Sequence, residues 1–110
     1  MKNVVYLIGR VGSDPEVRTL DGGKKVCSMS LATTETWTNK QGEKESDTQW
    51  HRLTIWNKAA EVAEKFVKKG DLLTIDGKII YRKYTDKEGV DRYNSEIVVS
   101  ELLLMPNKKD

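Results

Sequence analysis

The stretch from Thr48 to Trp56 reads TQWHRLTIW, and its alternation predicts a half-buried β-strand. Side chains of a strand point alternately to two faces, so odd-numbered and even-numbered residues belong to different surfaces. Leu53 and Ile55 make the odd face apolar and suited to a core. The even face carries two large rings and a guanidinium, from Trp50, Arg52 and Trp56. Such a face is suited to stacking bases and holding an anionic backbone, although ordinary packing under a loop explains this stretch equally well on its own.

The size and composition predict one small domain with a single modest core. The chain has 110 residues, 37% of them hydrophobic and 33% charged, and its net charge of +2 is too small to indicate a polyanionic partner by itself. No apolar run reaches the roughly 18 residues of a membrane span. The opening MKNVVYLIGRVG lacks the long apolar region and cleavage site of a signal peptide. The single cysteine, Cys27, cannot form an internal disulfide, so we expect a cytoplasmic protein.

Other strands flank this stretch on both sides. Further strands are predicted at Val4 to Val11, Val26 to Trp37, Leu72 to Tyr84 and Tyr93 to Leu104. Val17 to Leu20 continues the first strand or pairs with it. Turns are expected at Gly12 to Pro15, Asp21 to Gly23, Asn39 to Asp47 and Asp86 to Gly89. Leu73, Ile75, Ile79 and Tyr81 share one face of their strand, and Gly77 within it predicts a bulge or sharp bend.

One segment has a helical period. Lys58 to Lys69 reads KAAEVAEKFVKK, in which an apolar stripe recurs at the spacing of one helix face, formed by Ala59, Val62, Ala63 and Phe66 with Val67 beside it. Asn57 is the expected N-cap, Lys68 and Lys69 favour the negative end of the helix dipole, and Gly70 is the expected C-terminal glycine.

The predicted order is three strands, a helix and two strands. This is the layout of an all-β OB-fold, a five-stranded and partly open Greek-key barrel, over residues 1–104, with a short polar end at 105–110. A split sheet with one helix is the alternative, which strand order alone does not exclude.

The sequence contains few of the residue combinations that are typical of catalytic or metal sites, so we expect no enzyme activity, no cofactor and no metal. His51 is the single histidine and Cys27 the single cysteine, and both fall on faces assigned inward. A cysteine–histidine nucleophile needs both groups adjacent in an exposed pocket, and a zinc site needs more thiols and imidazoles. The glycines at Gly9, Gly12, Gly22 and Gly23 have the spacing of turns, not of a phosphate loop.

Aromatic and basic residues recur on the polar faces of several strands. The fourth predicted strand offers Lys78, Arg82 and Tyr84, and Trp37 stands beside a basic turn that holds Lys40 and Lys44. Leu, Ile and Val already occupy the inward positions. The pattern favours a platform for single-stranded nucleic acid, with a subunit interface as the alternative.

Taken together, these residues resemble the bacterial-type single-stranded DNA-binding protein family from Met1 to about Val99. The resemblance is carried by NVVYLIGRVGSDPEVR, SLATTETW, TQWHRLTIW, KAAEVAEKFVKKGD and RKYTDKEGVDRYNSEIVV. It implies an OB-fold that assembles as a homotetramer, with a homodimer as the alternative. It also implies binding of single-stranded DNA with little sequence preference during replication, recombination and repair at the nucleoid.

The resemblance implies roles for individual residues. Trp37 and Trp50 match the family's stacking tryptophans, Trp56 stands where phenylalanine is common, and Tyr84 stands where tryptophan is usual, so its stacking is weaker. Positions that follow the DNA path correspond to Arg52, Lys58, Lys69, Arg82 and Lys83. His51 matches a histidine near the subunit interface. Asn57 replaces a usual glycine and Met29 a usual phenylalanine, which we interpret as packing changes.

The C-terminal end departs from the family pattern. Family members normally continue into a flexible linker and an acidic, hydrophobic-tipped peptide that recruits replication and repair enzymes. This sequence stops at Pro106 to Asp110, as a naturally short paralogue or a truncated chain, so tail-mediated recruitment is not expected. An OB-fold primosome accessory protein that acts mainly through protein contacts is the alternative function.

Overall fold

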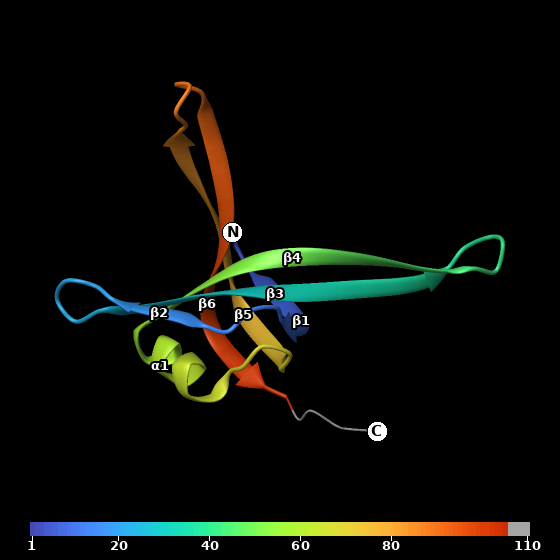
Figure 1. Cartoon of the computed structure of the whole chain (residues 1–110), viewed down its shortest axis with the longest axis horizontal. Helices are drawn as coiled ribbons and strands as arrows, with labels where there is room; N and C mark the ends of the chain where they lie inside the picture. The colour runs from blue at the N-terminus through green and yellow to red at the C-terminus, as the bar shows by residue number, and fades with distance from the viewer. Residues whose placement is uncertain (106–110) are drawn as a thin grey trace.

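The computed structural model describes residues 1–105 and shows, within them, six strands and one helix (Figure 1). The elements are β1 (Val5–Val11), β2 (Glu16–Thr19), β3 (Lys25–Thr38), β4 (Lys44–Trp56), α1 (Asn57–Phe66), β5 (Leu72–Thr85) and β6 (Asp91–Leu104). The five predicted strands and the helix are present, and β2 is an additional short strand. The short polar end expected at 105–110 lies outside the described residues, apart from Met105.

The strands form one sheet in the order β1-β5-β6-β4-β3-β2, and pairing of β1 with β3 closes it into a barrel. The closing contact joins Arg10 with Ala32 and Val11 with Leu31. β4 and β6 run parallel from Leu53 opposite Ile97 to Ile55 opposite Val99. A closed barrel with one helix between β4 and β5 confirms the predicted OB-fold, with β2 added at one edge.

β2 does not pair with β1 but continues it along the same edge of β3, where β1 pairs at Arg10 and Val11 and β2 pairs from Glu16 to Thr19. Of the two alternatives for Val17 to Leu20, continuation of the first strand is confirmed and pairing with it is wrong. Val17 lies opposite Cys27 in an antiparallel ladder. The turn between the two strands is closed by hydrogen bonds from Leu20 N–H to the Lys24 carbonyl, at 2.7 Å, and from Gly23 N–H to the Leu20 carbonyl, at 3.1 Å. The turn between them folds β3 back antiparallel to β2, so that the two strands it joins pair with each other.

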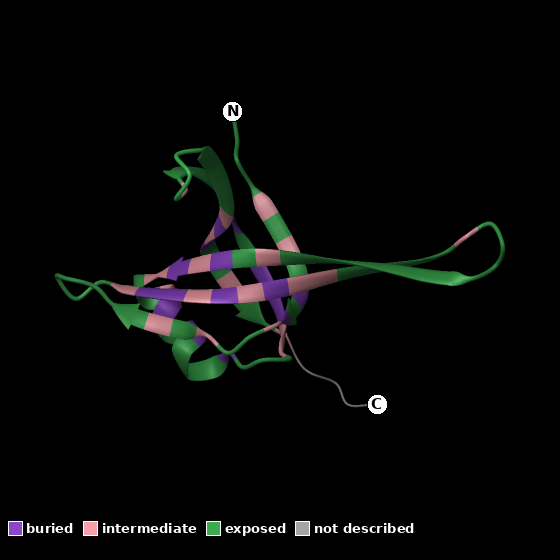
Figure 2. Ribbon diagram, turned by 45° about the horizontal axis from the view of Figure 1, so that its top comes forward, coloured by how far each residue is buried: buried purple, intermediate pink, exposed green. Residues whose placement is uncertain are grey.

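The barrel core is built from odd-numbered residues, as the alternation predicted. Leu31, Leu53, Ile55, Leu73 and Ile75 all have exposed fractions of 0%. Figure 2 shows the buried positions alternating along the strands of the barrel and absent from the outer parts of the two long hairpins. One apolar face of each strand therefore makes the core, and the other face is free for function.

Two hairpin arms leave the barrel in different directions (Figure 1). The β3–β4 arm comprises residues 34–50, and the β5–β6 arm comprises residues 81–95; nearly all of their residues are exposed. The strands run almost to the turns, because β4 begins at Lys44 instead of Thr48 and β6 at Asp91 instead of Tyr93. The hydrogen bonds between paired strands continue where there is no core beneath them. The polar ends that the sequence indicated as loops are therefore two-stranded ribbons.

The helix α1 is shorter than predicted. Val67 has extended dihedral angles, and its N–H bonds the Ala63 carbonyl at 3.0 Å, which ends the helix at Phe66. Lys68 and Lys69 therefore lie beyond its last turn, and Gly70 lies in the following turn with φ 93°. Within residues 1–105, no helix has both the length and the apolar character needed to cross a membrane.

The helix buries part of the predicted stripe. Ala63 and Val67 lie in the core and Ala59 packs against it, as predicted, whereas Val62 and Phe66 are 42% and 60% exposed. Ala60, which was not predicted to face inward, is buried with them. Small side chains let a helix approach a sheet closely, and this preference outweighed the larger apolar side chains.

Asn57 is not the N-cap that the sequence predicted. The N-cap is Trp56, with no capping hydrogen bond from its side chain, and Asn57 follows it with φ 56°. Asparagine is one of the few residues other than glycine that adopt this left-handed conformation readily. The replacement of the family's usual glycine by Asn57 is therefore explained by backbone conformation, and its interpretation as a packing change is corrected.

The bulge predicted at Gly77 is present. The pairing of β5 with β6 shifts register between Asp76 and Gly77, and a Cβ atom at Gly77 would lie 2.2 Å from the Val98 carbonyl oxygen. Beyond the bulge β5 leaves the barrel. Tyr81, expected inward with Leu73, is therefore 69% exposed, because it already belongs to the β5–β6 arm.

Candidate nucleic-acid interface

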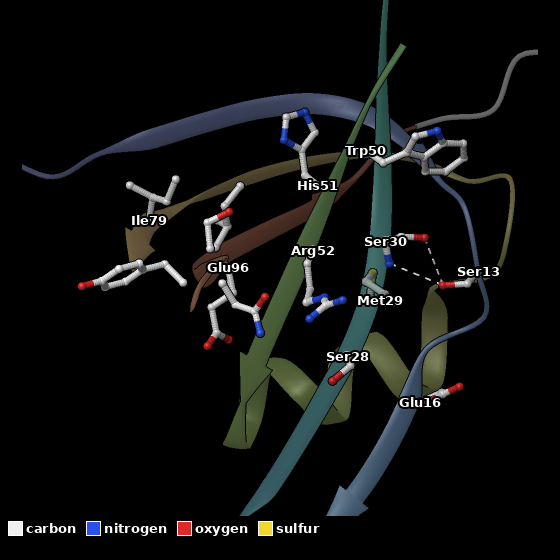
Figure 3. A pocket seen from close by; sticks show the side chains of 14 residues that line it. Ser13, Glu16, Ser28, Met29, Ser30, Trp50, His51, Arg52, Ile79 and Glu96 are labelled. Carbon is white, nitrogen blue, oxygen red and sulfur yellow. Dashed lines mark hydrogen bonds between the residues drawn. The ribbon is translucent and has the colours of Figure 1, made fainter. Parts of the chain in front are cut away.

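An open cavity of about 780 Å³ lies where β4 and β6 stop pairing, at the base of the two arms (Figure 3). It is lined by residues of β2, β3, β4, β5 and β6 and by Ser13 in the connection between β1 and β2. Trp50 and His51 project to opposite sides of β4, as alternation requires (Figure 3). The cavity brings together polar, basic and aromatic side chains from segments far apart in the chain.

Trp50 contributes an indole, the largest ring at this cavity. Its side chain is 64% exposed, although one edge of it lies against Gly12. A Cβ atom at Gly12 would lie 2.3 Å from Trp50 Cζ3 and 2.8 Å from Ser30 Oγ. The Ser30 hydroxyl is in turn 3.2 Å from Ser13 Oγ (Figure 3). Gly12 therefore contacts the edge of the indole ring, and much of the rest of the ring remains exposed to solvent.

Basic side chains extend from Trp50 along the same even-numbered face. Arg52 lines the cavity, and Figure 3 places it between Ser30 and Glu96. Glu96 accepts hydrogen bonds from the Thr54 hydroxyl on β4 and from Arg82 Nε on β5. This cluster joins three strands in one polar floor.

The floor holds Glu96 ionised. Burial raises the pKa of the Glu96 carboxyl, but hydrogen bonds from Thr54 and Arg82 and the charges of Arg82 and Arg52 outweigh burial and lower the pKa below its ordinary value. The charges of Arg82 and Arg52 therefore act on a Glu96 carboxylate that stays negatively charged at neutral pH. Arg82, a predicted DNA contact, is already half of an ion pair.

Trp37 lies away from this cavity, near the end of the β3–β4 arm. It is 46% exposed and lines a separate cavity of about 350 Å³ with Lys44 and other residues of the arm. The residue of β3 opposite Trp50 is Ala32, and at about 3.3 Å per residue Trp37 stands roughly 17 Å farther along the strand. Trp37 pairs with Glu45, so it belongs to the odd face of the ribbon.

Tyr84 and Lys83 belong to the β5–β6 arm. Tyr84 is 42% exposed, and Lys83 Nζ is 3.2 Å from an Asp91 carboxylate oxygen. Arg92 and the backbone N–H of Val90 bond to Asp86, which lowers the pKa of the Asp86 carboxyl. These exposed ion pairs are weak and readily exchanged, so they leave Lys83 available to a phosphate.

The remaining predicted contacts lie at the helix end of the barrel. Trp56 is only half-buried opposite Val26, so less of its ring is open than of Trp50. Lys58 is exposed in the first turn of α1. The backbone N–H of Lys69 bonds Asp14 Oδ1 at 3.0 Å, which ties its turn to the segment that carries Gly12. Lys69 is thereby placed on the Trp50 side of the barrel.

His51 and Cys27 are placed as packing or interface residues. His51 Nε2 is 2.9 Å from Thr33 Oγ1, and its predicted role at a subunit contact stays a prediction. Burial raises the pKa of the Cys27 thiol to about 11, helped by the charge of Glu64, so the thiol is protonated at neutral pH. Among residues 1–105, no group of three His, Cys, Asp or Glu side chains is arranged to hold a metal ion.

Sequence reasoning missed several residues of the cavity. Its floor and rim also contain Ser13, Ser30, Tyr93, Asn94 and Glu96. Alternation along the fifth predicted strand puts Asn94 and Glu96 on one face, so they could have been found from the parity of β6. The contact between Gly12 and Trp50 had no such signal, because it depends on how the segment after β1 runs beside Ser30 of β3.

Comparisons with known proteins give a consistent result. A profile of the Single-strand binding protein family matches residues 2–105. Proteins named single-stranded DNA-binding protein from serogroup A and serogroup B strains of Neisseria meningitidis are each 42% identical to the chain over 108 residues, 98% of this chain. The chain spans 62% of the length of these relatives.

Solved structures agree in fold. One described as Plasmodium falciparum SSB complex with ssDNA is 32% identical, with a TM-score of 0.86 and coverage of 96% of both chains. A deletion mutant of the single-stranded DNA binding protein from Thermus aquaticus has a TM-score of 0.83 and covers 97% of this chain and 52% of that chain. At 23% identity, this second likeness supports the fold alone.

Proposed function

The chain belongs to the single-strand binding protein family, and we propose that it binds single-stranded DNA with little sequence preference. The single observation that carries this proposal is the exposed ring of Trp50. One edge of this ring contacts Gly12, and the ring lies with Arg52 in a cavity at the base of the two arms. Every base has a flat face, so a ring of this kind accepts any of them.

Bases stack on the exposed rings, and the chain's cations hold the phosphates. Trp50 is the central ring, with Trp37 and Tyr84 farther out on the two arms and part of Trp56 at the helix end. Stacking contributes about 1–3 kcal/mol per base. The phosphates are met by Arg52, Lys58, Lys69, Arg82 and Lys83. Each such contact releases counterions, which makes the affinity depend on salt.

We propose that the protein assembles with copies of itself. Within the described residues, β1 pairs with β3 at Arg10 and Val11, and residues 5–8 have no recorded strand partner on that side. The outer side of β1 carries exposed apolar residues, with Tyr6 at 62% and Ile8 at 50%, and Leu103 at 65% lies in line with Ile8 through Thr74. An open edge and an apolar face support pairing with a second copy.

A homotetramer follows if two such pairs dock, as the resemblance to the family implies, and His51 is proposed to lie at a contact between copies. The proposal places residues 1–104 as the DNA-binding domain of a cytoplasmic, nucleoid-associated protein. Its roles would be those that protect single strands in replication, recombination and repair.

Titration with oligo-dT tests the binding proposal. We expect strong quenching of tryptophan fluorescence at low salt, because the rings of Trp50 and Trp37 stack on bases, and an affinity that falls as salt rises. The matched variant Trp50→Leu should remove much of the quenching while keeping the thermal unfolding transition. Absence of quenching at low salt would refute the proposal, and loss of the fold in Trp50→Leu would make Trp50 a core residue.

A further inference from the structure

Glu96 is an acidic side chain in the middle of a face proposed to bind an anionic polymer. Its side chain is 14% exposed, against 63% for the Arg82 side chain to which it is bonded. A carboxylate at this position repels phosphates, and this repulsion by itself lowers the affinity for DNA. The hydrogen bonds of Glu96 to Thr54 and Arg82 indicate a role that offsets this loss.

Glu96 connects the two parts of the face across β6. Arg82 on β5 pairs with Asn94, and Thr54 on β4 pairs with Val98, so each partner lies two residues from Glu96 along β6. Glu96 reaches diagonally to both. The contact lies where the β5–β6 arm leaves the barrel, and it fixes the side chain of Arg82 relative to β4.

Because Glu96 bonds the Nε atom of Arg82, the terminal nitrogens of the guanidinium remain for a ligand. A guanidinium has five N–H donors in a rigid plane, and the bond to Glu96 uses the one on Nε. The four N–H donors of the two terminal nitrogens lie farther out on a side chain that is 63% exposed. Fixing the plane at Nε therefore fixes the direction of a fork that suits a phosphate.

We propose that Glu96 is a positioning residue for DNA binding, which orients the Arg82 guanidinium so that its terminal N–H groups bind a phosphate. The inference rests on the proposed binding of single-stranded DNA. Glu96 touches Arg82 and Thr54, and its effect on DNA passes through Arg82. A lysine at position 82 has no second donor group along its stem and cannot serve the carboxylate and a phosphate in the same way.

Glu96→Leu removes the negative charge and both acceptor oxygens, and it separates this account from simple electrostatics because the two predict effects of opposite sign. Removal of a negative charge alone tightens binding of a polyanion. Loss of positioning weakens oligo-dT binding at low salt by roughly three- to tenfold, the range expected for a lost charge-assisted hydrogen bond offset by a favourable charge change. The slope of log affinity against log salt also becomes shallower by about 0.7, the value for one phosphate contact with a single strand.

The matched controls use the same titration. Asp21→Asn removes one negative charge from the exposed turn between β2 and β3 and should leave the affinity unchanged or slightly tighter. In an Arg82→Ala background, Glu96→Leu should no longer weaken binding, since no guanidinium is left to orient. Arg82→Lys should lose nearly as much affinity as Arg82→Ala, and it tests the inference while residue 96 remains glutamate.

The outcomes are distinct. Tighter binding by Glu96→Leu, or equal weakening by Glu96→Leu with and without Arg82, would overturn the inference, as would near-normal binding by Arg82→Lys. Failure of the unmodified protein to bind oligo-dT would instead refute the proposed function. Thermal unfolding of each variant shows whether a loss of binding follows a loss of fold.

Discussion

At the scale of single residues, the proposed surface depends on what surrounds each ring. Alternation from Leu53 and Ile55 was sufficient to predict that Trp50 points outward, and the structure confirms it with 64% exposure. The contact between Gly12 and the edge of this ring was not predictable, because the sequence indicated only a turn at Gly12. A ring held by its edge has lost part of its freedom before a base arrives, which lowers the entropic cost of stacking.

Gly12→Ala should therefore weaken oligo-dT binding by about 1 kcal/mol, a fraction of the stacking contribution of one base. The new methyl group would occupy space 2.3 Å from Trp50 Cζ3, so the ring must move. Fluorescence titration measures the effect. The substitution should make no further difference in a Trp50→Leu background, and an equal loss in that background would show that Gly12 acts elsewhere.

At the scale of the elements, the periodic patterns predicted the strands and the helix, and the misses have physical causes. The arms were read partly as loops because polar ribbons carry no apolar alternation. The helix face was wrong in part, because Ala60 lies in the core with the predicted Ala63 while Val62 and Phe66 are exposed. Asn57 looked like a cap because asparagine favours both N-caps and the left-handed conformation, and sequence alone does not separate the two.

Substitutions at Asn57 distinguish these two roles. With φ 56°, Asn57→Gly should leave the free energy of unfolding nearly unchanged, whereas Asn57→Ala should lower it by about 1 kcal/mol. Urea unfolding of the two variants gives the comparison directly. Equal stability of the alanine and glycine variants would mean that the left-handed conformation is not what selects the residue.

At the scale of the whole molecule, the fold leaves two kinds of surface uncovered. One is the aromatic and basic even face proposed for DNA. The other is the outer side of β1, with Tyr6 and Ile8, beside the edge of β1 opposite β5, which within residues 1–105 has no strand partner at residues 5–8. Assembly with a second copy was implied by family resemblance alone, because the sequence does not reveal which strand edge the barrel leaves open.

Ile8→Asp should dissociate the proposed assembly into monomers, because it places a charge on the face that would be covered. Sedimentation velocity at micromolar concentration measures the change. Val62→Asp, at a 42% exposed apolar position on α1, should keep the assembly of the unmodified protein. A monomeric unmodified protein would contradict the assembly proposal, and dissociation by Val62→Asp alone would move the interface to α1.

The central claim is that single-stranded DNA lies across the even face of β4 with a base on Trp50. Photocrosslinking with oligo-dT that carries iodo-deoxyuridine, followed by mass spectrometry of the peptides, tests it most directly. We predict that Trp50 is a principal adduct, accompanied by Trp37 or Tyr84 on the arms. Adducts confined to residues such as Tyr6 or Phe66, with none at Trp50, would contradict the account.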